Sequence, residues 1–208
     1  MNNEVIEILT KVGAIISNDH FVGASGLHFD TYVNKDFLFL HPKETSKICK
    51  LLAEKYKNEN IEIVVGPAMG GIILSQWLAN SLSDIYGKEV LSVYSEKTEN
   101  ERQELRRGYS EQVKGKRVLV VEDIITTGES LVKALDAVRK IGGNIIGACA
   151  LVNKNESLNP IKIFGVPFYA LADLYTPTYK KEDCPLCKTK VPINTQFGHG
   201  NKFLVKSK

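Results

Sequence analysis

One stretch decides the fold of this chain, residues 118–130 with the sequence VLVVEDIITTGES. Its first four residues are apolar and mostly β-branched, as in a parallel strand that is covered on both faces. Glu122 and Asp123 should therefore emerge at the carboxyl end of that strand, where open α/β sheets bind their ligands. Apolar residues at helical spacing begin at Leu131, so the stretch predicts a strand, a loop and a helix in direct succession.

The loop between this strand and this helix predicts an anion site. Ser130 can cap the helix, which Gly142 and Gly143 would end, and the backbone amides of the loop then remain free for an anion. The loop has neither the lysine of a nucleotide-triphosphate loop nor the glycine pattern of a dinucleotide fold. Two carboxylates would repel a phosphate unless they face something else. The vicinal hydroxyls of a ribose, with a metal ion nearby, meet that need.

Strands and helices alternate regularly after Pro42. This rhythm predicts a mostly parallel sheet with helices on its faces. We expect one domain over residues 1–208, with an N-terminal lobe called the hood (1–42), an α/β core (43–175) and a C-terminal extension (176–208). Helices are expected at 3–16, 44–57, 71–83 and 131–141, and strands at 61–65, 89–94, 117–121, 144–152 and 167–173.

Composition narrows the class of protein. The chain has 208 residues, 43% of them hydrophobic, which is enough for one substantial core. A net charge of +3, from 27 basic and 24 acidic residues, does not suggest a nucleic-acid-binding protein. No apolar run approaches the roughly 18 residues of a membrane span, and the first residues lack the basic start of a signal peptide. We therefore expect a cytoplasmic protein without a membrane partner.

The stretch 118–130 closely resembles the phosphoribosyl pyrophosphate signature of the type I phosphoribosyltransferases: four hydrophobic residues, two acidic ones, two more hydrophobic ones, then Thr-Gly and a small hydroxyl residue. Further motifs extend the resemblance along nearly the whole chain, to the orotate phosphoribosyltransferases and more narrowly to their compact bacterial branch. These motifs are His20-Phe21, Ser25-Gly26-Leu27-His28, Tyr32, residues 66–71, Glu96-Lys97, residues 105–108 and Cys184-Pro185-Leu186-Cys187.

The resemblance implies a type I phosphoribosyltransferase fold and a glycosyltransferase of pyrimidine biosynthesis. Its substrates would be phosphoribosyl pyrophosphate and orotate, its cofactor Mg²⁺, and its assembly a homodimer with shared active sites. Two alternatives remain open. One is a phosphoribosyltransferase for another nucleobase, and the other is a regulator that senses phosphoribosyl pyrophosphate. A regulator needs a DNA-binding lobe, and the first 42 residues are too short for a winged helix.

Site residues follow from the same resemblance. Glu122 and Asp123 would grasp the 2- and 3-hydroxyls of the ribose, one or both through magnesium that is held by substrate and water rather than by a protein cage. Glu129 departs from the family, which often has a small residue there: turned to solvent it would be harmless, and turned inward it would weaken phosphate binding. Thr126, Thr127, Gly128 and Ser130 would cradle the 5-phosphate through hydroxyls and amides. Ile124, Ile125 and Glu129 complete the stretch that is expected to bind substrate.

Two further segments are expected to meet pyrophosphate. In residues 66–71, Gly66, Ala68 and Gly70 would approach it through backbone amides, although a tight strand-to-helix turn explains the same glycines. Residues 95–116 are polar, and a long structureless connection within a compact domain is often a functional lid. Lys97, as a catalytic cation, and Arg102, Arg106 and Arg107 would neutralise pyrophosphate from it. The dense basic loop of better-known relatives, with its histidine, is absent, so a solvated charge run is the alternative.

Lys154 is the candidate for recognising the carboxylate of the base. The family places an Asp-Arg pair here, whereas this chain has Asn153-Lys154, which keeps the charge and loses the two-pronged geometry. Thr126 would offer another donor. The hood also departs, with Ala24 where many relatives carry lysine. Phe21 and Tyr32 fit either the wall of the base pocket or a core.

The four cysteines divide into two kinds. Cys49 and Cys149 lie in apolar patterns typical of buried positions. Cys184 and Cys187 form a Cys-x-x-Cys pair, which fits half of a zinc site, a redox pair or a tight structural turn around Pro185. Zinc normally needs four ligands, and His199 is the only later candidate in the sequence.

Overall fold

The computed structural model describes residues 2–206 and contains a central six-stranded sheet in the order β10-β9-β8-β5-β6-β7. All neighbouring strands are parallel except β6 and β7, which confirms the predicted mostly parallel α/β architecture. The strands are β5 (Ile63–Pro67), β6 (Leu91–Lys97), β7 (Gln103–Glu104), β8 (Arg117–Ile125), β9 (Asn144–Asn153) and β10 (Phe168–Asp173).

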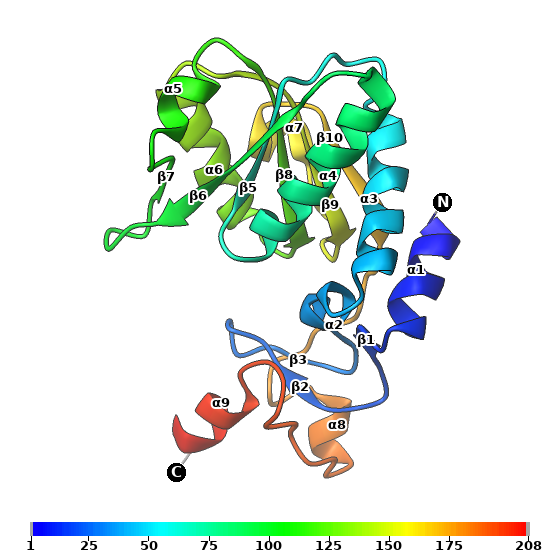
Figure 1. The fold of residues 1–208 in the computed structure, drawn as a ribbon. Helices are drawn as coiled ribbons and strands as arrows, with labels where there is room; N and C mark the ends of the chain where they lie inside the picture. Colours follow the sequence, from blue (N-terminus) through cyan, green and yellow to red (C-terminus); the bar gives the residue numbers. More distant parts are fainter. Residues whose placement is uncertain (1, 207–208) are drawn as a thin grey trace.

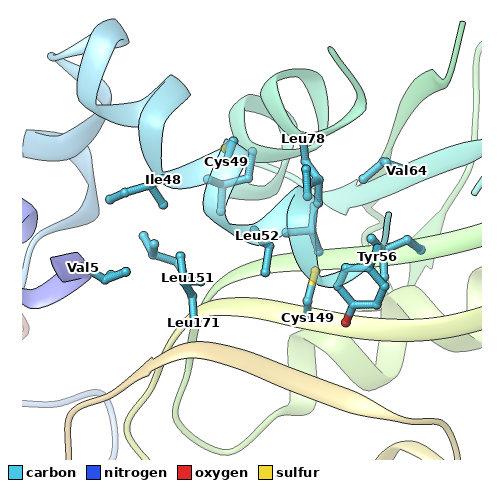
Figure 2. Close-up of a cluster of buried hydrophobic side chains, with 14 of the residues drawn as sticks. Val5, Ile48, Cys49, Leu52, Tyr56, Val64, Leu78, Cys149, Leu151 and Leu171 are labelled. Atoms are coloured by element: carbon cyan, nitrogen blue, oxygen red, sulfur yellow. The ribbon is translucent and has the colours of Figure 1, made fainter. Parts of the chain in front are cut away.

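Helices cover both faces of this sheet, as Figure 1 shows. Helices α1 (Asn2–Lys11), α3 (Pro42–Lys55) and α4 (Gly70–Tyr86) pack on one face, and α5 (Tyr109–Val113), α6 (Glu129–Lys140) and α7 (Pro160–Phe164) pack on the other. Each face of the sheet has its own hydrophobic core: the first lies under α1, α3 and α4, and the second under α5, α6 and α7. Alternate residues of β8 point into them, Leu119 and Val121 into the first and Val118 and Val120 into the second. Figure 2 shows part of the first core.

The hood lies beyond the carboxyl ends of the core strands (Figure 1). It contains two small antiparallel sheets, β1 (Ile15–Ile16) with β4 (Tyr32–Val33) and β2 (Phe21–Val22) with β3 (His28–Phe29), followed by α2 (Lys35–Phe39). Within the predicted hood, α1 instead packs on the core through Val5 and Leu9.

The C-terminal extension packs against the hood and contains α8 (Pro185–Lys188) and α9 (Gly200–Lys206). A β-bridge joins His28 to Tyr179, and the Asn194 amide donates to the His20 carbonyl at 2.7 Å. Phe197 stacks on Tyr32, with 6.1 Å between ring centroids. Two segments far apart in the sequence therefore build one lobe.

Four sequence expectations need correction. The strand expected to stop at Val121 continues to Ile125, and the next helix is capped by Gly128 rather than by Ser130. The helix expected over 3–16 ends at Lys11, since Gly13 adopts a left-handed conformation with φ of 71°. The segment 95–116 is not structureless: β6 continues to Lys97 and turns back into β7.

Candidate active site

Glu122 and Asp123 lie in the last part of β8 and are largely buried. Only 5% of Glu122 is exposed. Its Oε1 accepts a hydrogen bond from the Asp123 amide at 3.0 Å, whereas Oε2 has no hydrogen-bond partner within the described chain. A buried carboxylate oxygen without a hydrogen-bond donor is energetically costly. We therefore expect a ligand to supply a donor or a cation to Glu122 Oε2.

Burial and mutual repulsion perturb this acidic pair. Burial raises the pKa of Glu122, and the neighbouring Asp123 charge adds to the rise. Burial also raises the pKa of Asp123, but the charge of Lys35 opposes that rise. Two carboxylates that repel each other in a buried place are stabilised by hydroxyl donors or by a cation.

Lys35 is a site residue that sequence reasoning missed. Its Nζ lies 3.5 Å from Asp123 Oδ2, and it begins α2, where the hood meets the core. Burial tends to lower the pKa of Lys35, but Asp123 and Asp36 outweigh it and the net pKa is raised. No motif marks this lysine, because its partner lies far along the chain and only the hood's position brings the two together.

The loop of residues 66–71, called the glycine loop, joins β5 to α4 directly beside Asp123. A Cβ on Gly66 would lie 1.9 Å from the Gly71 carbonyl oxygen, and a Cβ on Gly70 would lie 1.8 Å from Asp123 Oδ2. Both positions therefore require glycine. The loop is a tight strand-to-helix turn, and it also lies against the acidic pair, so the two expectations for it are compatible. The peptide bond between Ala68 and Met69 is cis.

Residues 126–130, called the phosphate loop, lead into the amino end of α6. Gly128 has φ of 82°, and a Cβ there would lie 2.8 Å from the Phe164 ring, so only glycine fits. Thr126, Thr127 and Ser130 are exposed. The Glu129 amide donates to Thr127 Oγ1 at 3.3 Å, whereas Gly128, the N-cap residue, has no side chain to accept from the other amides. Free amides and hydroxyls at a helix N-terminus form an anion site.

Three other residues within 118–130 are expected to bind substrate, but their side chains point elsewhere or are buried. The Glu129 carboxylate extends along α6 to Lys133, with 2.6 Å between Oε1 and Nζ, and its side chain is 68% exposed, so it points outward. Ile125 is buried in the second core and contributes through its backbone, whose carbonyl accepts from the Lys154 amide at 2.8 Å. Ile124 is half-buried against the first core.

Lys154 follows β9 and reaches from the core to the hood. Its Nζ donates to the Thr31 carbonyl at 3.3 Å and lies 4.8 Å from the centroid of the Phe29 ring. Burial lowers the pKa of Lys154, and the charge of Asp30 opposes this. A partly buried ammonium without a full ion pair gains from an anionic ligand. Its neighbour Asn153 is structural, since its amide donates to Asp173 at 2.9 Å.

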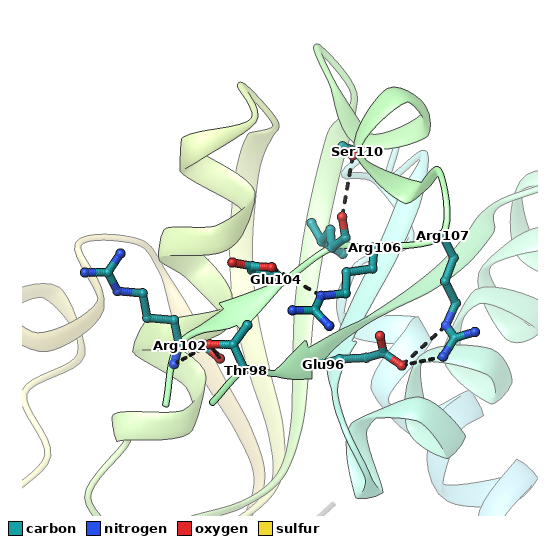
Figure 3. Close-up of polar contacts among 8 residues, drawn as sticks. Glu96, Thr98, Arg102, Glu104, Arg106, Arg107 and Ser110 are labelled. Atoms are coloured by element: carbon teal, nitrogen blue, oxygen red, sulfur yellow. Dashed lines mark hydrogen bonds and ion pairs between the residues drawn. The ribbon is translucent and has the colours of Figure 1, made fainter. Parts of the chain in front are cut away.

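The structure does not bring the lid cations to the acidic pair. Lys97 pairs with Glu101 at 3.0 Å, and Arg106 pairs with Glu104 at 3.2 Å, all within the β6–β7 hairpin or just after it. Figure 3 shows the Arg106–Glu104 pair and a second pair, Arg107 with Glu96 at 2.8 Å, while the Arg102 guanidinium extends away from both carboxylates drawn there. Lys97, Arg106 and Arg107 are thus paired with carboxylates of the lid itself, and the contact of the lid cations with pyrophosphate stays a prediction.

The two aromatic residues of the hood are part of a small aromatic core. Phe21 is fully buried and contacts Phe29 and Tyr32, with ring centroids 5.9 Å and 5.4 Å away. Phe21 therefore belongs to the core and not to a pocket wall. Tyr32 is half-buried between Phe21 and Phe197.

Comparison with known proteins decides the family. The sequence profile of the phosphoribosyl transferase domain matches residues 36–167, more than half of the chain. An orotate phosphoribosyltransferase of Caldanaerobacter subterraneus subsp. tengcongensis is 40% identical over 191 residues, which cover 91% of this chain and 94% of that protein. The chain belongs to the orotate phosphoribosyltransferase family. The orotate phosphoribosyltransferase of Thermotoga maritima is 37% identical over 197 residues, covering 94% of this chain and 98% of the relative.

Solved structures agree with this family assignment. Orotate phosphoribosyltransferase from Aeropyrum pernix matches with a TM-score of 0.66 and 26% identity, over 82% of this chain and 93% of that one. The predicted type I phosphoribosyltransferase fold and the predicted transferase class are confirmed. None of the helices within residues 2–206 combines the length and the apolar composition needed to cross a lipid bilayer.

Proposed function

We propose that this chain transfers ribose 5-phosphate from phosphoribosyl pyrophosphate to orotate, giving orotidine 5-monophosphate and pyrophosphate in pyrimidine biosynthesis. One observation carries the proposal. The buried Glu122–Asp123 pair lies between a glycine loop that touches Asp123 and a phosphate loop at the start of α6. This arrangement offers acceptors for ribose hydroxyls beside two groups of backbone donors for phosphates.

In the reaction, the bond from the ribose C1 to pyrophosphate breaks and its electron pair leaves with pyrophosphate. The base nitrogen bonds to C1 and gives up its proton. The transition state then carries positive charge on the sugar and negative charge on the leaving group. Glu122 and Asp123 hold the 2- and 3-hydroxyls and place a negative field beside the developing cation. Thr126, Thr127 and Ser130 fix the 5-phosphate, so that C1 stays aligned with the base.

The glycine loop and the lid act on pyrophosphate. Gly66, Ala68 and Gly70 bring backbone donors to its oxygens. Lys97, Arg102 and Arg106 add positive charge when the lid closes, and each must then leave its present position in the hairpin. Closure also excludes water, which would otherwise attack C1 and hydrolyse phosphoribosyl pyrophosphate.

Magnesium fits this site because the acidic pair includes an oxygen with no donor and offers the hard oxygen ligands that the ion prefers. Glu122 and Asp123 would help to hold the ion, which when bound would supply positive charge that stabilises pyrophosphate as a leaving group. Lys35 has a different role from the ion. Its ammonium balances the charge of Asp123 in the empty site, and it can contact the substrate phosphates in the filled site.

The base test uses a panel of orotate, uracil, adenine, guanine and hypoxanthine, each with phosphoribosyl pyrophosphate and magnesium, scored by pyrophosphate release. Orotate should be the preferred substrate. Preferential use of a purine or of uracil would instead assign this chain to another base.

Variants at Lys154 extend this test to specificity. Lys154→Ala should raise the orotate KM roughly tenfold or more, because it removes the cation that faces the carboxylate. Lys154→Arg should keep or improve orotate use, since the fork matches a carboxylate. Lys162→Ala, an exposed lysine of α7, is the matched control and should leave KM unchanged. Unchanged orotate kinetics in Lys154→Ala would place this residue outside the base pocket.

A further inference from the structure

Four side chains with metal-binding atoms converge where the hood meets the C-terminal extension. His20 precedes β2, His28 begins β3, Cys184 precedes α8 and Cys187 lies within α8. One ligand atom from each side chain lies within 4.8 Å of all the others. Three of the four residues are buried, and both cysteines are free thiols.

The distances approach those of a tetrahedral metal site. The sulfur atoms of Cys184 and Cys187 lie 3.7 Å and 3.8 Å from His20 Nε2, and the Cys187 sulfur lies 3.5 Å from His28 Nδ1. Bond lengths of about 2.3 Å to sulfur and about 2.0 Å to nitrogen place tetrahedral sulfur and nitrogen ligands about 3.5 Å apart. The two ring nitrogens lie 2.7 Å apart and would separate by about 0.6 Å to hold a metal.

His20 is already oriented as a ligand. Its Nδ1 lies 2.7 Å from the Val191 carbonyl, which can only accept, so Nδ1 carries the proton and Nε2 presents a lone pair to the cluster. A histidine that binds metal through one nitrogen usually donates from the other to a carbonyl or carboxylate. The Val191 carbonyl therefore fixes the orientation and the protonated nitrogen of the His20 ring, as hydrogen-bond partners of metal-binding histidines do.

We infer that His20, His28, Cys184 and Cys187 bind one zinc ion. Two thiolates and two imidazoles are the donors that zinc prefers, and hard ions such as magnesium prefer oxygen. Four protein ligands leave no open position for a water or a substrate, so the site is structural and not catalytic. The second pair of ligands comes from the hood, and not from His199, the candidate that the C-terminal sequence offers.

The hood explains why such a site is useful. Each of its strands has only two residues, and the lobe depends on a small aromatic core. A small lobe of this kind gains stability from a metal that crosslinks distant segments. The ion would join residues 164 positions apart, His20 and Cys184. It would also fix β3, whose Phe29 ring lies beneath Lys154.

The first experiment measures metal in the wild-type protein. The full chain, expressed in zinc-supplemented medium and desalted, should contain about one zinc ion per chain by elemental mass spectrometry. Replacement by cobalt should give the intense visible absorption of a tetrahedral thiolate site. A strong chelator should lower Tm by roughly 5–15 °C, and added zinc should restore it.

Variants then locate the ion. Cys187→Ser and His28→Asn should lose zinc and the chelator response of Tm, while His199→Ala, an exposed histidine of the same extension, should keep both. The inference is wrong if the wild-type protein contains no zinc and its Tm changes with neither chelator nor added zinc. This result is decisive even if the variants fail to fold. A Cys184–Cys187 disulfide in the native protein, seen by mass spectrometry without reductant, would overturn the inference as well. These readouts do not depend on which nucleobase the chain uses.

Discussion

At the scale of single residues, Glu122 combines a stability cost with a catalytic role. Burial and Asp123 raise its pKa in the folded protein above the unfolded value. A carboxyl group with a raised folded pKa stabilises the fold below its unfolded pKa, and this contribution is lost as pH rises through the folded pKa. Above its folded pKa of about 7, the ionised Glu122 therefore destabilises the empty enzyme, which is the expected cost of a preorganised substrate site.

Glu122→Gln should consequently separate stability from activity. The variant keeps the oxygen that accepts from the Asp123 amide but removes the buried charge. We expect unfolding free energy to increase by about 1 to 3 kcal/mol near pH 8, with the difference closing toward about pH 4, while kcat falls roughly tenfold to a thousandfold. Denaturant titrations across this pH range and steady-state kinetics provide the measurements. A variant that is less stable at high pH, or one with normal kcat, contradicts this account of Glu122.

At the scale of elements, the glycine loop and β8 must fit together closely. Gly70→Ala places a methyl group where Asp123 Oδ2 now lies, and Lys35 Cε is only 2.9 Å from the same point. We expect kcat/KM to fall about 100-fold or more and Tm to fall as well, since either the loop or the carboxylate must shift. Gln76→Ala, on the exposed face of α4, is the control and should change neither.

A double variant identifies the cause. If the clash with Asp123 lowers stability, Asp123→Ala should recover part of the lost Tm in the Gly70→Ala background without recovering activity. Additive losses of Tm in the double variant would show that the alanine acts elsewhere, for example through Gly71 and the start of α4.

The elements also show what a sequence can predict. The run VLVVEDIITTGES predicted a strand, an anion-binding turn and a helix because these depend on residues adjacent in the chain. The pairing of Lys35 with Asp123, and of His20 and His28 with the Cys184–Cys187 pair, had no local signal. These contacts depend on the packing of the hood against the core and the extension. Ser130 was a wrong N-cap because Gly128, held against Phe164, ends the loop two residues earlier.

At the scale of the whole molecule, the lid of residues 95–108 keeps its cations away from the acidic pair of its own chain. Lys97 pairs within the hairpin, and its side chain is 59% exposed. Apolar side chains are exposed near the site, with Met69 81% exposed in the glycine loop and Leu40 71% exposed after α2. A second copy of the chain could cover these residues and receive the lid, which is the arrangement of a two-fold dimer with shared sites.

Mixing two inactive variants tests this assembly. Lys97→Ala and Asp123→Asn should each lose activity alone, and a mixed dimer with shared sites regains one site that has Asp123 from one chain and Lys97 from the other. Random pairing of equal amounts makes about half of the dimers mixed, so activity should return to roughly a quarter of wild type. Mixing either variant with itself is the control and should restore nothing. If each lid serves its own chain, every site in the mixture keeps one lesion, and activity stays at the level of the separate variants despite confirmed subunit exchange. A chain that remains monomeric by light scattering at assay concentration would reject the shared site directly.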